Sequence, residues 1–121
     1  MVGTFESLLK ELVEKTPGAE AALIMDAAGI ALATFASRAA KFDIATIGIE
    51  YTVVVSAAKQ ASAMLEAGEA REVAVTTAGL VTLLRTVGTD YFLALAMTPR
   101  GNLGKGRFLM RTLEPKLLAL L

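Results

Sequence analysis

The segment that decides the fold is Ile44–Leu65, with the sequence IATIGIEYTVVVSAAKQASAML. It contains one acid, Glu50, and one base, Lys59, and almost all of its other residues are apolar or small. The YTVVV run inside it has the composition of a strand. However, the segment continues far beyond the length of a normal strand without a turn signal, and Gly68 stands where a helix cap is often found. We therefore predict one long helix.

A helical wheel gives this helix two apolar sides, one of which we expect to lie on the chain's own sheet. The side predicted to face the sheet consists of Ile47, Tyr51, Val54, Ala58, Ala61 and Leu65. The other side is mostly small or β-branched and consists of Ile44, Gly48, Thr52, Val55, Ser56, Lys59 and Ser62. A helix that is apolar on two sides is covered on both, and the simplest second cover is another copy of the chain about a two-fold axis. In the alternative, Glu50, Lys59 and the hydroxyl groups solvate this side in a monomer.

The remaining segments predict a single α+β domain over residues 1–121, with one five-stranded antiparallel sheet. A first helix follows the capping residue Thr4 and ends at the Thr16-Pro17-Gly18 break. The predicted strands are Glu20–Asp26, Ile30–Phe35, Arg71–Thr77, Leu80–Val87 and Tyr91–Met97. A last helix begins after Asn102, and Pro115 is expected to kink or break it. Helices on both faces of the sheet explain why the strands lack regular polar alternation.

The composition excludes several classes of function. The chain has 121 residues, is 55% hydrophobic, and carries 12 bases and 12 acids, so it lacks the basic excess of a nucleic-acid-binding protein. It contains no cysteine and no histidine, which excludes thiolate and imidazole chemistry, and no cofactor is expected. Neither a signal peptide nor a long uncharged apolar stretch is present. We expect a cytoplasmic protein without membrane insertion.

The stretch Pro99–Arg107, PRGNLGKGR, is the nearest approach to a phosphate-binding loop. A P-loop needs a glycine five residues before its Gly-Lys pair and a serine or threonine directly after it. Here a proline occupies the first of these positions and a glycine the last, so the motif is absent. We interpret Gly101, Gly104 and Gly106 as allowing the last helix to start close to the sheet. An anion bound at the N-terminus of that helix is the alternative.

Charged and aromatic residues elsewhere are interpreted as surface or packing features. The densest basic cluster consists of Arg100, Lys105, Arg107, Arg111 and Lys116. Only Phe108 offers an aromatic ring beside it, so a solvated helix face is favoured over a nucleic-acid patch, which would interleave several aromatics. Tyr51 is either a packed aromatic or an anchor in an interface.

Three motifs together resemble those of the Roadblock/dynein light chain family, which includes the MglB type of bacterial gliding motility. They are TPGAEAALIMDAAG at 16–29, VAV at 73–75, and NLGKGR at 102–107, which opens the last helix. The resemblance covers essentially the whole chain. It implies a profilin-like order α-β-β-α-β-β-β-α, with the first and last helices on one face of the sheet and the long helix on the other.

The resemblance also implies a function without catalysis. It predicts a homodimer in which the strands at Arg71–Thr77 pair edge to edge and the long helices pack across the two-fold axis. The predicted interface residues are Gly48, Thr52, Val55, Ser56, Lys59, Arg71, Val73, Ala74, Val75 and Thr77. The dimer is expected to regulate or scaffold a small Ras-like GTPase. The candidate GTPase contacts are Arg38, Lys41, Lys59 and Glu66. If an arginine finger is used, Arg38 is the candidate, but scaffolding without a finger is favoured.

A second hypothesis competes with this one. In it, the glycine-rich start of the last helix binds a small molecule or an anion, and the domain is a sensor. A bound ligand around residues 101–106 would favour the sensor, whereas a two-fold dimer with a continuous sheet would favour the scaffold.

Overall fold

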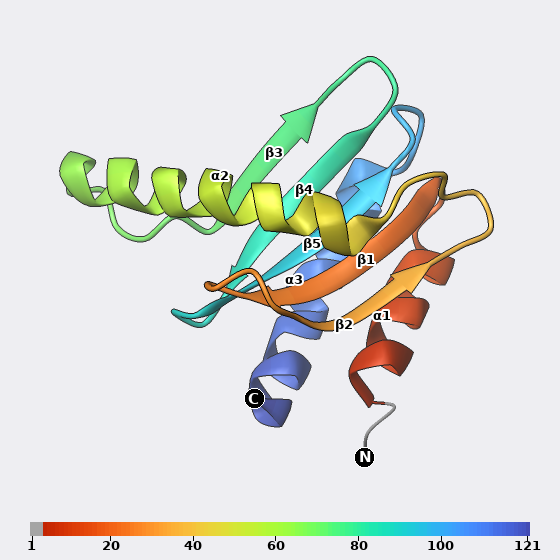
Figure 1. Cartoon of the computed structure of the whole chain (residues 1–121), viewed down its shortest axis with the longest axis horizontal. Coiled ribbons are helices and arrows are strands. Elements are labelled where there is room, and N and C mark those ends of the chain that lie inside the picture. Colours follow the sequence, from red (N-terminus) through yellow and green to blue (C-terminus); the bar gives the residue numbers. More distant parts are fainter. Residues whose placement is uncertain (1–3) are drawn as a thin grey trace.

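A computed structural model describes residues 4–121; residues 1–3 of the predicted domain lie outside the described part of the chain (Figure 1). Its elements are α1 (Thr4–Lys15), β1 (Ala19–Asp26), β2 (Ala31–Ala36), α2 (Ile44–Leu65), β3 (Glu72–Thr76), β4 (Val81–Val87), β5 (Tyr91–Met97) and α3 (Leu103–Leu120). The five strands form one sheet in the order β2-β1-β5-β4-β3, and every neighbouring pair is antiparallel. The predicted fold class is confirmed.

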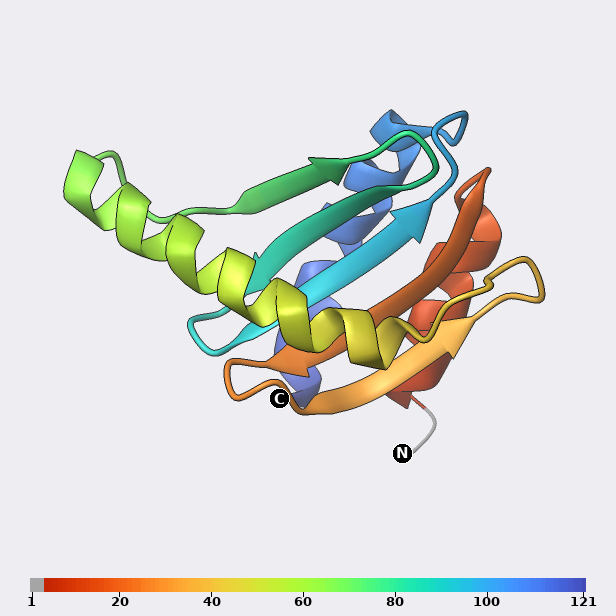
Figure 2. The ribbon, with the colours of Figure 1, turned by 45° about the horizontal axis from the view of Figure 1, so that its top comes forward.

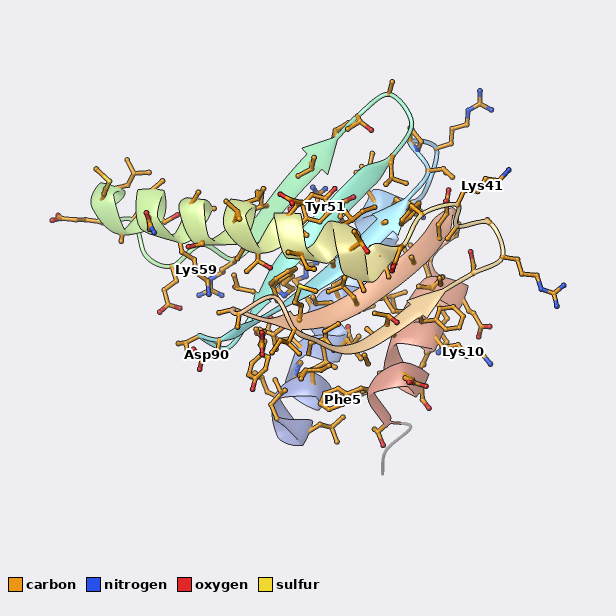
Figure 3. The ribbon with its side chains drawn as sticks, viewed as in Figure 1. Phe5, Lys10, Lys41, Tyr51, Lys59 and Asp90 are labelled. Carbon is orange, nitrogen blue, oxygen red and sulfur yellow. The ribbon has the colours of Figure 1, made fainter. Side chains whose placement is uncertain are left out.

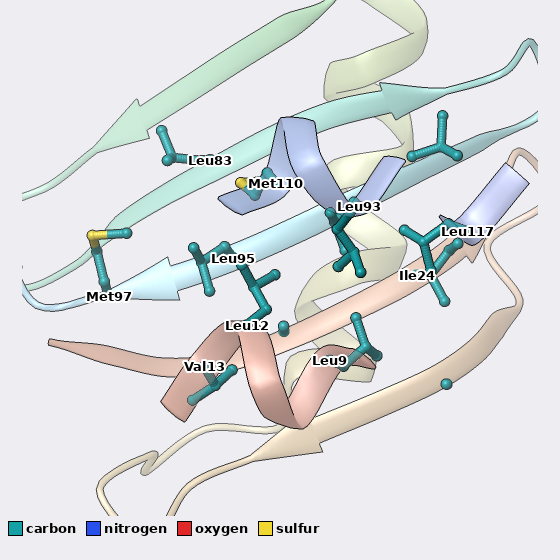
Figure 4. Packing of buried hydrophobic residues seen from close by; sticks show 14 of the residues in the cluster. Leu9, Leu12, Val13, Ile24, Leu83, Leu93, Leu95, Met97, Met110 and Leu117 are labelled. Atoms are coloured by element: carbon teal, nitrogen blue, oxygen red, sulfur yellow. The ribbon is translucent and has the colours of Figure 1, made fainter. Parts of the chain in front are cut away.

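The helices cover the two faces of the sheet as the family resemblance implied. Figures 1 and 2 show α1 and α3 on one face and α2 alone on the other. The core between the sheet and the α1–α3 layer is rich in large aliphatic side chains, several of which are drawn in Figure 4. The core beneath α2 combines the small residues Ala21, Ala94 and Ala96 with larger ones such as Leu23, Met25 and Phe92.

The closest approach of α2 to the sheet occurs at Gly48. A Cβ atom added there would lie 2.7 Å from Leu23 Cδ2 and 2.8 Å from Met25 Cε. Real Cβ atoms essentially never come this near to another heavy atom, so a side chain at the crossing point of helix and sheet would force the ends of the Leu23 and Met25 side chains to shift. Gly48 thus fixes which side of α2 faces the chain's own sheet.

The glycines around the start of α3 also serve close packing. A Cβ on Gly18 would lie 2.5 Å from the Cα of Gly101, and one on Gly106 would lie 3.0 Å from Met97 Cε. The packing interpretation is therefore confirmed for Gly101 and Gly106. Gly104 differs, because a Cβ there would meet only an Asn102 side-chain oxygen at 3.7 Å.

Two predictions about helix ends are tested by the structure. α3 runs as one helix from Leu103 to Leu120, so the break at Pro115 is absent. α2 is capped by Glu66, which takes a left-handed φ of 54°, and its backbone N–H donates to the Ala63 carbonyl. Gly68 follows two residues later with φ +91° and shapes the turn toward β3 rather than the cap itself.

Candidate interaction surface on α2 and β3

β3 is an edge strand whose outer backbone groups are free to pair. The N–H of Thr77 donates to the Leu80 carbonyl, and the N–H of Thr86 donates to the Arg71 carbonyl. Hydrogen-bonded pairs alternate along an antiparallel ladder, so residues 71, 73, 75 and 77 direct their backbone groups at β4. The backbone N–H and C=O groups of Glu72, Ala74 and Thr76 therefore point away from the sheet, toward the open edge.

The side chains of β3 leave this edge accessible. Val73 and Val75 are half-buried and pack on the α2 side of the sheet, whereas Ala74 is exposed and small. Glu72 accepts from Arg107 Nε of α3 at 3.1 Å, so its charge is held back over the α3 face. Edge strands often carry a proline, a bulge or free charges that discourage pairing, and β3 has neither a proline nor a bulge.

The side of α2 that was assigned to a partner faces the chain's own sheet instead. Gly48 is buried, and Val55 is 5% exposed within the core beneath the helix. Thr52 Oγ1 donates to the Gly48 carbonyl at 3.0 Å, and Lys59 Nζ donates to the Thr89 carbonyl at 2.9 Å. Gly48 and Val55 therefore do not face a partner, and their assignment to the dimer interface is wrong. Thr52 and Lys59 are half-buried and bonded within the domain, while Ser56 is exposed.

The stripe that was assigned to the sheet forms a flank of α2 directed toward β4 and the β3 edge. Tyr51, labelled in Figure 3, donates its hydroxyl to Thr82 Oγ1 of β4 at 3.2 Å, so it is a packed aromatic. Farther along the same stripe, Val54 is 37% exposed and Leu65 is 74% exposed. We call Val54, Ala58, Ala61 and Leu65 the flank of α2. It carries no charge.

The C-terminal part of α2 projects beyond the sheet at the end where β3 begins (Figure 2). No residue of α2 after Val55 is buried, and Met64 at the tip is 86% exposed. Beneath this overhang lies a groove of about 480 Å³ lined by Lys59, Ser62, Glu66 and Glu69, among others. An apolar helix end in this position is stabilised when another surface covers it.

The four candidate GTPase contacts fall into two groups. Arg38 and Lys41 are exposed on the loop before α2, and Lys59 and Glu66 lie toward the other end of the helix. Figure 3 shows Lys41 and Lys59 far apart along α2. A helix of 22 residues spans roughly 33 Å at 1.5 Å per residue. One chain alone therefore does not bring the two groups together.

The described residues 4–121 offer little for chemistry. Within them, no three histidine, cysteine, aspartate or glutamate side chains lie close enough together to hold a metal ion. Every buried polar side-chain atom in the same range has a hydrogen-bond partner. Asn102 Oδ1 accepts the Lys105 N–H at 3.0 Å, so the chain itself caps the α3 N-terminus that was considered for an anion. None of the helices in this range is long and apolar enough to cross a membrane.

Comparison with known proteins defines the family. The model of the Roadblock/LC7 domain matches residues 5–97, which is most of the chain. The chain belongs to the Roadblock/LC7 family. MglC from Myxococcus xanthus is 34% identical to it over 100% of both chains, with a TM-score of 0.71. No curated protein sequence matches.

Two further structures share the fold of this chain at lower identity. An MglB structure described as having a tetrameric arrangement is 19% identical, covers 98% of this chain and 88% of its own, and has a TM-score of 0.88. Profilin IA from Acanthamoeba castellanii is 14% identical over 96% of this chain and 98% of its own, with a TM-score of 0.64. The second similarity confirms the profilin-like description of the fold.

The outermost apolar residues of α2 were not among the predicted site residues of this Roadblock/LC7 chain. Ile49 and Val53 lie one turn apart on α2 and are 54% and 66% exposed. Ile30, at the β1–β2 turn, is also exposed, and the neighbouring Gly29 lies beside Ile49 and Thr52. The i, i+4 spacing of Ile49 and Val53 was the available signal. It was hidden because nearly every position of α2 is apolar or small.

Proposed function

We propose that this Roadblock/LC7 protein is a non-enzymatic homodimer that binds a small Ras-like GTPase and regulates or scaffolds it in the cytoplasm. The observation that carries the proposal is the unpaired β3 edge beside the uncovered flank and overhang of α2. Family membership supports it, because the resemblance to Roadblock proteins implies both the dimer and the GTPase partner.

The free backbone groups of β3 define how two copies would pair. Antiparallel self-pairing about a two-fold axis is longest when Ala74 sits on the axis and Glu72 lies opposite Thr76 of the second copy. In this register all outward-facing residues pair, which gives about six inter-chain hydrogen bonds. A shift by two residues in either direction leaves one outward-facing residue of each strand unpaired.

The same axis places the two α2 helices beside each other. A two-fold axis perpendicular to the sheet reverses every direction within its plane, so the helices run antiparallel. Their flanks then meet through Val54, Ala58, Ala61 and Leu65, and the two alanines permit close approach of the helix backbones. The overhanging end of each α2 extends over the other copy. We propose these flank residues, together with Arg71, Val73, Ala74, Val75 and Thr77, as the dimer interface.

The outer surface of the α2 pair is our candidate for the GTPase site. It presents Ile49 and Val53 from both copies, which remain uncovered after the flanks pack together. Antiparallel helices also move Lys59 and Glu66 of one copy toward the loop with Arg38 and Lys41 of the other. A site composed from both chains supports a stoichiometry of one GTPase per dimer.

Titration of purified small GTPases onto the protein tests this function. Each Ras-like GTPase encoded in the same genome is loaded with GDP or with a GTP analogue and titrated by calorimetry. We expect one of them to bind in one nucleotide state, and Val53→Glu to abolish the binding while the far-UV circular dichroism is unchanged. The protein alone should hydrolyse no GTP. Absence of binding by every GTPase in both states would refute the proposed function.

A further inference from the structure

The α1–α3 layer carries a second uncovered surface, on the face of the sheet opposite α2. Phe108 of α3 is 58% exposed. Every other phenylalanine and tyrosine among residues 4–121 is buried or half-buried. Large aromatic side chains have much to gain from burial. Single exposed apolar residues are common on protein surfaces, so the surroundings of the ring decide whether it marks a contact site.

The position of Phe108 on α3 rules out a role in the core. α3 buries Gly106 and Met110 against the sheet, and Phe108 is two residues from each, which is roughly 200° around the helix. One turn earlier stands Gly104, which has no side chain to shield the ring. One turn later, Thr112 Oγ1 donates to the Phe108 carbonyl and so turns its hydroxyl along the helix. The Phe108 ring therefore protrudes from α3, and no side chain at position 104 covers it. We call this protruding ring the Phe108 ridge.

A shallow groove of about 50 Å³ runs between α1 and α3, and Leu109, the residue after Phe108, is part of its lining. Its apolar lining is Leu8 and Leu12 from α1 and Leu109 and Leu113 from α3, and its polar lining is Glu11, Lys15, Thr112 and Lys116. Leu8 and Leu109 are only half-buried. A ridge next to a groove on a helix pair fits the apolar side of an incoming amphipathic helix.

The charges around the ridge define the partner. Among the ion pairs of residues 4–121, Arg107 is bound to Glu72, and Glu114, the only acid of α3, is bound to Arg85 at 2.6 Å. Lys105, Arg111 and Lys116 of α3 have no such pair. The exposed cations of α3 are therefore uncompensated by acids of their own helix, and they lie on both sides of the Phe108 ridge.

α1 contributes a mixture of charges to the same layer. Its Glu11 accepts a hydrogen bond from Lys15, and this bond, together with the Lys15 and Lys116 charges, lowers the pKa of the Glu11 carboxyl. Glu6 and Glu14 are two further acids of α1. A flat anionic membrane would meet these acids as well as the α3 cations, and the chain has no net positive charge to offset them. A narrow partner that lies along α3 meets mainly the cations.

We propose that the Phe108 ridge and the α1–α3 groove dock an acidic amphipathic helix of a second partner protein. Its apolar side would cover Phe108 and the groove, and its carboxylates would pair with Lys105, Arg111 and Lys116. Because this surface lies on the opposite face of the sheet from α2, both faces can be occupied at once. The inference does not depend on the GTPase proposal.

Two synthetic helical peptides of 18 residues, identical in their leucine-rich apolar side, test this proposal. One carries glutamate and the other lysine at every polar position, and each is titrated onto the ¹⁵N-labelled full chain. We expect the acidic peptide to bind, with the amide shifts concentrated between residues 104 and 116. Phe108→Ala should weaken its binding at least tenfold, whereas the matched control Leu118→Ala, at another exposed position of α3, should not.

A charge-reversal variant distinguishes electrostatic docking from nonspecific apolar binding. The double variant Lys105→Glu/Arg111→Glu is expected to lose the acidic peptide and to bind the lysine peptide instead. Equal binding of both peptides to the unaltered chain, amide shifts centred on α2 or β3, or no binding of the acidic peptide would each overturn the proposal. So would sedimentation of the chain with phosphatidylglycerol vesicles but not with phosphatidylcholine vesicles, if Phe108→Ala abolishes it.

Discussion

Replacement of Ala74 by proline tests the edge pairing of β3 in depth. The Ala74 N–H points away from β4, so its loss removes no hydrogen bond within the chain. In the proposed dimer, however, Ala74 sits on the two-fold axis, and the change removes the N–H of both copies. We therefore expect a folded protein whose dimer is selectively weakened.

The size of the effect follows from the register. Two of about six inter-chain hydrogen bonds disappear, each with a net value of about 1 kcal/mol, and the carbonyl partners left unpaired add a further cost of similar size. The sum is about 2–4 kcal/mol. At 1.4 kcal/mol for each factor of ten, the dimer dissociation constant should rise roughly 30- to 700-fold.

Sedimentation equilibrium over a range of concentrations measures this constant, and Thr34→Pro provides a matched control. Thr34 is exposed on β2, the edge strand on the other side of the sheet. The Ser37 N–H donates to the Glu20 carbonyl of β1. Because residues of an antiparallel strand point their backbone groups alternately toward and away from the neighbouring strand, the Thr34 N–H points outward, as the Ala74 N–H does. The Thr34→Pro variant should be at least as stable to unfolding as the Ala74→Pro variant. Its dimer dissociation constant should equal that of the unaltered chain. Equal dimer constants for the two variants would refute the reasoning.

Three other substitutions distinguish the sides of α2. Val55→Glu places a charge in the core beneath α2 and should destabilise the fold by several kcal/mol, measured by urea denaturation; a folded monomer would contradict this. Gly48→Ala should cost about 1–3 kcal/mol in the same assay, because its Cβ overpacks Leu23 and Met25; an unchanged midpoint would be inconsistent with the close crossing. Leu65→Glu should leave the fold intact but raise the dimer dissociation constant at least tenfold, whereas Gln60→Glu, elsewhere on the exposed surface of α2, should change it little.

The sequence predicted the order of the elements well because the local signals agree. The α1 stripe of apolar residues, the break at Thr16–Gly18, and the turns at Gly29 and Gly88 each specify an end without information from distant parts of the chain. The length of α2 was likewise evident from the absence of any turn residue before its end. These features predict the bounds of the strands to within one residue, whereas the family resemblance was needed for the placement of the helices on the two faces of the sheet.

The orientation of α2 was not predictable in the same way. Its periodicity shows two apolar sides but does not say which one meets the sheet. That choice depends on Leu23 and Met25 of β1, whose side-chain ends lie directly against the Gly48 backbone. The ion pair between Arg107 and Glu72 joins residues 35 positions apart. The position of a base within the basic cluster of the sequence therefore did not indicate whether its charge is paired.

Native mass spectrometry of the protein mixed with its GTPase partner tests the central claim most directly. The GTPase is the one identified by titration, loaded in its binding-competent nucleotide state and mixed at low micromolar concentration. We predict a complex of two copies of this chain, each of 12.7 kDa, with one GTPase, beside free dimer. A complex that contains a single copy of the chain, or a mixture in which the chain occurs only as a free monomer, would contradict the account.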